Sequence, residues 1–264
     1  MIIRDQLQRE ITFEKPLRCI VSLVPSQTEL LVDLGLEENL VGITKFCVHP
    51  VHLLKTKPSV GGTKGVNFKK IRELQPDIIL CNKEENTAEM VEELEKIAPV
   101  HVSEVIEIKD ALELIEMYGV LFNKKETAET LVNNIEKKIN DFKNLLPINL
   151  KVAYLIWRKP WMVTGNNTFI NSLLKFNGWE NAFAQREERY PVIELEELNV
   201  AAPDLILLSS EPFPFQEKHK KEIENIYKGT IAFVNGEYFS WYGSRLLAAI
   251  EYFGQFQKQL SSSL

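Results

Sequence analysis

Aromatic side chains gather in loops that directly follow two predicted strands. Trp157 and Trp161 come at the end of one strand, and Trp241 and Tyr242 come after another. Such rings give wide, flat and rigid contact to a large, partly apolar molecule. The alternative is that aromatic residues at strand ends cap the core, and for neighbours such as Phe213 the two explanations are equally good. Together the four rings favour ligand contact.

Charged side chains lie in loops of the same kind. Glu84 and Glu85 follow one predicted strand, Glu211 follows another, and Arg245 comes shortly after the last. Any one of these charges alone is more often solvated surface. Beside the aromatic rings, they are candidates for the few polar groups that orient a bound molecule.

One loop carries possible metal ligands. Cys47 and His49 form a Cys-x-His pair, and His52 is nearby. Two or three soft ligands are fewer than a closed zinc site needs, although they do not exclude a soft metal. We therefore predict no metal site and no obligatory cofactor.

Motifs of catalysis and nucleotide binding are absent. The stretch VGGTK at 60–64 lacks P-loop spacing, and no Gly-x-Ser-x-Gly elbow occurs. No motif pairs a nucleophile with a base, so the sequence gives no support to an enzyme.

Composition excludes several further classes of protein. The net charge of −6 argues against nucleic-acid binding, and 264 residues suffice for one large domain or two lobes. Three widely spaced cysteines do not form a disulfide framework. The N-terminus is too charged for a signal peptide, and no stretch is long enough to insert in a membrane. As it stands, the sequence predicts a cytoplasmic protein; it would be periplasmic or on the cell surface if a leader has been removed.

A long helix organises the predicted elements. Asn123 is a good N-cap with Glu126 three positions later, and Pro147 ends the helix. The sequence has the same pattern on both sides of this helix. A short helix, a Pro-Asp turn and an apolar strand are predicted at 70–80 and again at 197–207. This indicates duplicated lobes, or simply a common α/β joint. We predict lobes at 1–122 and 148–264, joined by a helix at 123–147.

Strands alternating with helices predict mainly parallel sheets, whose ligands bind beyond the carboxyl ends of the strands.

Ser26 and Glu29 are expected to form a second capping box, at the start of a helix at 27–34.

The order and spacing of several motifs resemble one family over nearly the whole chain. It is the helical-backbone metal receptors, the vitamin B12 and iron–siderophore substrate-binding proteins of ABC importers, and the cobalamin branch is the most similar. The motifs are RCIVSLVPSQTELL at 18–31, LVGIT at 40–44, VGG at 60–62, NFKKI at 67–71, PDIIL at 76–80, WRKPW at 157–161, TGNNTF at 164–169 and GWEN at 178–181.

The resemblance implies two α/β lobes joined by one long helix, the class III periplasmic-binding-protein fold, with a metal chelate held between them. It adds loop 45–50 with His49, and Asn86 and Tyr190, to the predicted binding residues. It also implies acidic residues on each lobe that meet arginines of a permease. By alignment these positions are Glu196, which is retained, and Lys69, whose positive charge would weaken such docking.

The sequence thus predicts a substrate-binding protein related to ABC transporters, with a cobalamin-like corrinoid as ligand. Haem or a ferric siderophore would also suit the rings. The alternative is a cytoplasmic enzyme or chaperone acting on a tetrapyrrole through Glu211 or His49. Expected partners are the small-molecule chelate and possibly a permease.

Overall fold

The computed structural model describes residues 1–144 and 149–261, which form two compact units. The first comprises Met1–Val105, Lys109–Ile135 and Tyr242–Arg245. The second comprises Ile106–Ile108, Glu136–Trp241 and Leu246–Leu264. The chain therefore passes from one unit to the other more than once. The predicted lobe boundaries at 122 and 148 stay a prediction.

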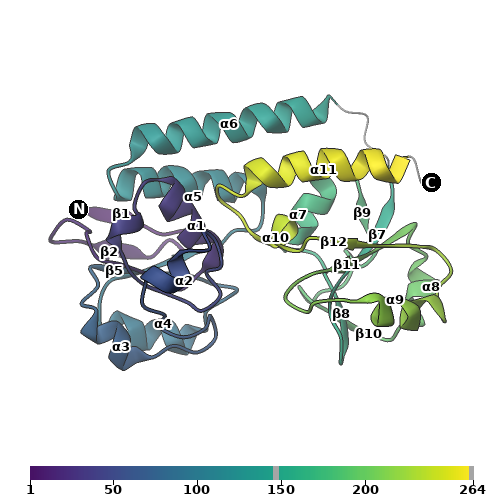
Figure 1. Ribbon diagram of the computed structural model, residues 1–264, viewed down its shortest axis with the longest axis horizontal. Helices are drawn as coiled ribbons and strands as arrows, with labels where there is room; N and C mark the ends of the chain where they lie inside the picture. Colours follow the sequence, from purple (N-terminus) through teal and green to yellow (C-terminus); the bar gives the residue numbers. More distant parts are fainter. Residues whose placement is uncertain (145–148, 262–264) are drawn as a thin grey trace. The chain divides into compact units, whose positions relative to one another are not determined.

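The first unit is built on a wholly parallel four-stranded sheet in the order β4-β3-β5-β6, beside an antiparallel β1–β2 hairpin (Figure 1). Its strands are β1 (Ile2–Arg4), β2 (Glu10–Thr12), β3 (Ile20–Ser22), β4 (Leu40–Ile43), β5 (Ile78–Asn82) and β6 (Val100–Ser103). The helical segments are α1 (Pro25–Asp33), η1 (Glu37–Asn39), α2 (Leu53–Thr56), α3 (Phe68–Glu73), α4 (Ala88–Glu95) and α5 (Ile108–Leu121).

Helices cover both faces of this sheet, which is why its strands read as continuous apolar runs. On one face Ile79 and Val100 pack with Ile71 of α3 and Leu94 of α4. On the other lie α1 and α5, and Tyr118 of α5 contacts the ring of His101. The predicted α/β class is confirmed here.

The second unit has a six-stranded mixed sheet in the order β10-β8-β7-β11-β12, with β9 paired to β7. β11 is parallel to β7 and β12, whereas β8 is antiparallel to β7 and β10 is antiparallel to β8. Its strands are β7 (Lys151–Trp157), β8 (Trp161–Val163), β9 (Glu180–Asn181), β10 (Val192–Ile193), β11 (Leu205–Ser209) and β12 (Thr230–Val234). Its helices are α7 (Phe169–Phe176), α8 (Glu197–Ala201), α9 (Glu217–Glu224), α10 (Glu237–Ser240) and α11 (Leu246–Ser261).

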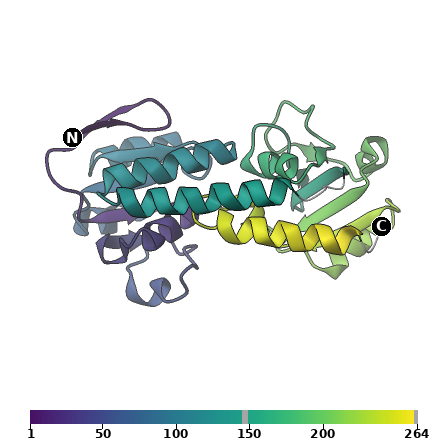
Figure 2. The same cartoon turned by 90° about the horizontal axis from the view of Figure 1, so that it is seen from above.

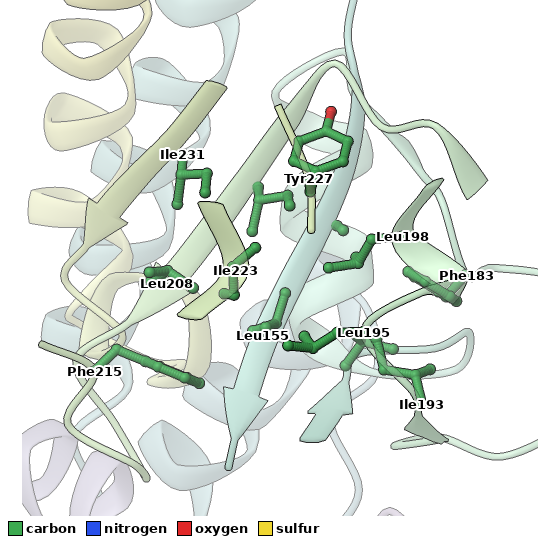
Figure 3. Close-up of a cluster of buried hydrophobic side chains, with 13 residues drawn as sticks. Leu155, Phe183, Ile193, Leu195, Leu198, Leu208, Phe215, Ile223, Tyr227 and Ile231 are labelled. Atoms are coloured by element: carbon green, nitrogen blue, oxygen red, sulfur yellow. The ribbon is translucent and has the colours of Figure 1, made fainter. Parts of the chain in front are cut away.

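The core of the second unit lies against one face of this sheet (Figure 3). Leu155 of β7 and Leu208 of β11 pack there with Leu198 of α8 and Ile223 of α9. The opposite face of the sheet presents Tyr154, whose ring lies 5.1 Å from that of Phe239.

Helix α6 (Lys125–Lys143) is the predicted long helix, and the chain passes from the first unit to the second between Ile135 and Glu136 (Figures 1 and 2). Asn123 is not its N-cap. That residue adopts a left-handed backbone (φ 56°), as is common just after a helix end, and the helix that ends there is α5. The predicted end at 145–147 lies outside the described residues.

The two Pro-Asp turns make the same joint in both units. Asp77 donates its N–H to the Cys19 carbonyl at 2.7 Å, and its carboxylate accepts from the Cys19 N–H at 2.9 Å. Asp204 makes the matching pair of bonds with Lys151, both at 2.7 Å. Each aspartate thus fixes the start of its strand against the neighbouring strand, which supports the duplication read from the sequence.

Within the described residues, no helix combines the length and apolar character needed to cross a bilayer.

His101 of β6 is a fully buried titratable group. Its Nε2 lies 3.0 Å from the Met117 sulfur, and its Nδ1 has no hydrogen-bond partner among the described residues. Burial lowers the pKa of His101 to about 4, although the nearby Asp5 carboxylate acts the other way.

We expect this histidine to make the protein sensitive to acid. Between pH 6.5 and about 4, His101 is protonated in the unfolded chain but stays neutral in the folded protein. The free energy of unfolding therefore decreases as the pH is lowered through this window, by up to about 3 kcal/mol. Urea unfolding across the window should show a shallower pH slope for His101→Gln than for the parent chain. Because other titrating groups are common to both proteins, identical slopes would contradict the assignment.

Candidate functional site

The loop after β5 is organised by two buried asparagines. Asn82 Oδ1 accepts the Glu84 N–H at 2.8 Å, and Asn86 Oδ1 accepts the Asn82 N–H at 2.8 Å. Asn86 also donates to the Thr63 carbonyl at 2.8 Å. The Asn86 amide, predicted as a ligand contact, is therefore engaged within the first unit, whereas Glu84 and Glu85 remain half-buried at the loop surface. Asn82 was not predicted.

A buried amide joins four segments of the first unit. Gln27 Nε2 donates to Ser103 Oγ at 2.6 Å and to Tyr242 Oη at 3.0 Å, while its Oε1 accepts from Tyr118 Oη at 2.7 Å. Burial raises the pKa of Tyr242, so its hydroxyl stays neutral. Tyr242, predicted to offer a ring to the ligand, is only 5% exposed. The ring is thus largely covered in the core, and its predicted contact with the ligand stays a prediction.

Arg245 is likewise occupied within the first unit. Its Nε and Nη2 donate to the two carboxylate oxygens of Glu29 at 2.7 and 2.6 Å. Both side chains are largely buried, at 10% and 16% exposure. The predicted capping box was also wrong, because α1 begins at Pro25 and no side chain caps it. Ser26 therefore lies inside the first turn, and Glu29 serves the ion pair.

The Cys47 loop does not gather a metal site among the described residues. Cys47 is buried, with its sulfur 3.1 Å from Thr28 Oγ1 and 3.3 Å from Thr44 Oγ1, and burial raises the pKa of its thiol. His49 is half-buried, and His52 Nε2 lies 2.8 Å from Glu37 Oε1. No group of three or more His, Cys, Asp or Glu side chains there could hold a metal ion.

In the second unit the strand β7 ends at Trp157, whose side chain is 39% exposed. Its ring stands edge-on to Phe213 at 5.7 Å, so it is held in place while keeping open surface. Trp161 is different. It stacks on Phe215 at 6.0 Å, and the Arg158 guanidinium lies 5.5 Å from its ring centre. Trp161 is therefore packed mainly within its own unit.

Glu211 and Trp241 bond to each other. Glu211 Oε1 accepts from Trp241 Nε1 at 3.0 Å and from Ser240 Oγ at 2.6 Å. Trp241 is only 7% exposed, and its predicted contact with the ligand stays a prediction. Tyr190 is half-buried in the loop before β10.

The two positions predicted to meet a permease are both on the surface. Lys69 is exposed on α3 of the first unit, and Glu196 is exposed just before α8 of the second.

Comparison with known proteins agrees with this architecture. The family model described as "Periplasmic binding protein" matches residues 20–229. The chain belongs to this family. Its curated relatives include the vitamin B12-binding protein of Vibrio campbellii, 23% identical over 74% of this chain and 71% of that one. Another is an uncharacterised ABC transporter substrate-binding lipoprotein of Bacillus subtilis, 27% identical over 70% of this chain and 61% of that one.

Solved structures share the fold. The periplasmic vitamin B12 binding protein of Vibrio cholerae superposes with a TM-score of 0.77 at 20% identity, covering 92% of this chain and 97% of that one. A periplasmic heme-binding protein from Roseiflexus superposes with a TM-score of 0.75 at 18% identity, covering 91% and 98%. As a member of this family, the chain is a substrate-binding protein related to ABC transporters and not an enzyme.

We expect the Glu29–Arg245 pair to stabilise the first unit. Replacing Arg245 by Met leaves a largely buried carboxylate without its cation and should cost about 2 kcal/mol of unfolding free energy. Denaturant unfolding of Glu29→Gln, Arg245→Met and the double variant measures this. The double variant should lose less than the sum of the single losses. Additive losses would show that the pair contributes nothing beyond its separate side chains.

Proposed function

We propose that the chain captures a corrinoid of the cobalamin type as the substrate-binding component of an ABC importer. The observation that carries this is Trp157, whose ring is 39% exposed at the end of β7 and held edge-on by Phe213. A rigid, partly exposed indole suits the apolar face of a large ring system. The vitamin B12-binding proteins among the relatives support this class of ligand.

Polar contacts would come from groups at other strand ends. Glu84 and Glu85 are half-buried in a loop fixed by Asn82 and Asn86. Carboxylates are acceptors for amide N–H groups, which a corrin ring carries at its edge. His49 and Tyr190, both half-buried, complete the residues that we assign to ligand contact. Trp241, Tyr242 and Arg245 are instead assigned to support of the loops.

Haem is the second candidate ligand. The heme-binding protein of Roseiflexus shares the fold, and His49 offers an imidazole in the loop after β4. A haem complex should show a Soret band whose position shifts in His49→Ala, because the axial imidazole is lost, whereas a corrinoid complex should not depend on this histidine in the same way.

The proposed partner is a permease, for which Glu196 retains the acidic character expected from the resemblance. Lys69 reverses the charge at the other position. A lysine facing an arginine would disfavour association, so this partner would have to differ in charge there.

We expect Trp157 to determine ligand affinity. Titration of cyanocobalamin, cobinamide, haem and a ferric siderophore, followed by tryptophan fluorescence with inner-filter correction, should show saturable quenching by a corrinoid. Trp157→Ala should raise its dissociation constant about tenfold or more, because a partly exposed aromatic anchor is lost. Isothermal calorimetry checks the affinity without relying on the fluorophore that was removed.

The matched control is Trp241→Phe, which replaces a buried indole by a smaller phenyl ring and removes its N–H donor. It should lower stability through the lost bond to Glu211 and the smaller buried ring, while leaving the dissociation constant within about twofold, since we assign Trp241 to loop support and not to ligand contact. Equal affinity for Trp157→Ala and the parent chain would sink the assignment of Trp157. Absence of saturation with every chelate would sink the proposed ligand class.

A further inference from the structure

One stretch of the first unit is basic throughout. Residues 45–72, here called the basic segment, contain six lysines, one arginine and no aspartate or glutamate. The whole chain has a net charge of −6, so the remaining residues carry −13. Positive charge is therefore concentrated in one continuous part of an otherwise acidic protein.

The cations of the basic segment face solvent. Five are exposed and two are half-buried, and none pairs with a carboxylate among the described residues. Lys64 and Lys70 donate to the backbone carbonyls of Glu84 and Ser59. The seven are Lys45, Lys55, Lys57, Lys64, Lys69, Lys70 and Arg72.

Exposed apolar side chains accompany these charges. Phe46, Val48, Val51 and Leu54 are 48%, 37%, 71% and 43% exposed. They are four of the eleven exposed large apolar side chains among the described residues, although they fall within nine consecutive positions. The Lys45 ammonium lies 5.0 Å from the centre of the Phe46 ring, so charge and apolar surface are contiguous.

This exposure is built into the fold of the loop. Cys47 and Leu53 are fully buried and anchor it to the core, leaving their neighbours outside. The chain then returns beside β4, where the Ile43 N–H donates to the Pro58 carbonyl at 3.0 Å and the Ile43 carbonyl accepts from Val60 at 2.8 Å. The outward side chains are held by packing and backbone hydrogen bonds on both sides.

We propose that the basic segment docks on an anionic lipid surface. Lysines beside shallowly inserting apolar side chains are the combination that binds such a surface. The excess of lysine over arginine favours lipid over a protein partner, because protein interfaces are enriched in arginine and depleted in lysine. This surface goes beyond the proposed ligand binding. The basic segment includes His49, which we assign to ligand contact, and Lys69, which we assign to the permease-facing position, and the substitutions tested below leave His49 in place.

Carboxylates border the segment and limit its strength. Glu37 lies 2.8 Å from His52 Nε2, and Glu73 follows Arg72 directly. The attraction therefore rests on the excess of cations and should weaken as salt is raised.

The test is sedimentation of the protein with vesicles of phosphatidylcholine and phosphatidylglycerol in equal amounts, against vesicles of phosphatidylcholine alone. The parent chain should bind only the anionic vesicles, and less at high salt. Lys55→Glu with Lys69→Glu should lower the partition coefficient about thirtyfold or more, since each cation near an anionic surface contributes about fivefold. Val51→Ser should lower it by a smaller factor.

The matched control is Lys175→Glu with Lys218→Glu, two exposed lysines of the second unit that make the same change in net charge. This control should bind the anionic vesicles to within about twofold of the parent chain, because a specific surface and not net charge attracts them. Equal loss in both pairs, binding to neutral vesicles, or no vesicle binding would each overturn the proposal, the last in favour of an acidic protein partner. Chelate titration of the same variants reports separately on the proposed function.

Discussion

A single buried amide carries more of the first unit than its size suggests. Gln27 sits in α1 with no exposed surface, yet it bonds to side chains from β6, α5 and the segment that precedes α11. A buried polar group left without partners costs about 1–3 kcal/mol, so the four segments are favoured in one arrangement. The same arrangement places Arg245 beside Glu29, and the chain thereby returns to the first unit after most of the second has been built.

Hydrogen bonding distinguishes three of the predicted contact residues from Trp157. Tyr242, Arg245 and Trp241 use their polar atoms within their own units, where burial requires each donor or acceptor to be satisfied. Trp157 instead keeps an open face while Phe213 fixes its edge. A rigid exposed ring would lose little conformational entropy on contact with a ligand, which is consistent with the role that we propose for Trp157.

The duplicated Pro-Asp joints show how one local solution serves two different sheets. Asp77 and Asp204 each exchange two hydrogen bonds with the start of the adjacent strand, although the first sheet is wholly parallel and the second is mixed. The joint sets the relative height of two neighbouring strands, and hence where their carboxyl ends and the following loops lie. Loops of different chemistry can then be carried on the same frame.

The sequence by itself determined the α/β class and the long helix, because apolar periodicity and local motifs report directly on backbone geometry. The family was indicated by resemblance, through the order and spacing of several motifs. The sequence also placed Trp157 at the end of a strand. It could not distinguish Trp157 from Trp241, or show that Ser26 lies inside a helix turn while Glu29 pairs with a residue 216 positions away. Those outcomes depend on which side chains meet across the core. Distant segments bury and hydrogen-bond one another only in the tertiary structure, so the local sequence does not reveal these contacts.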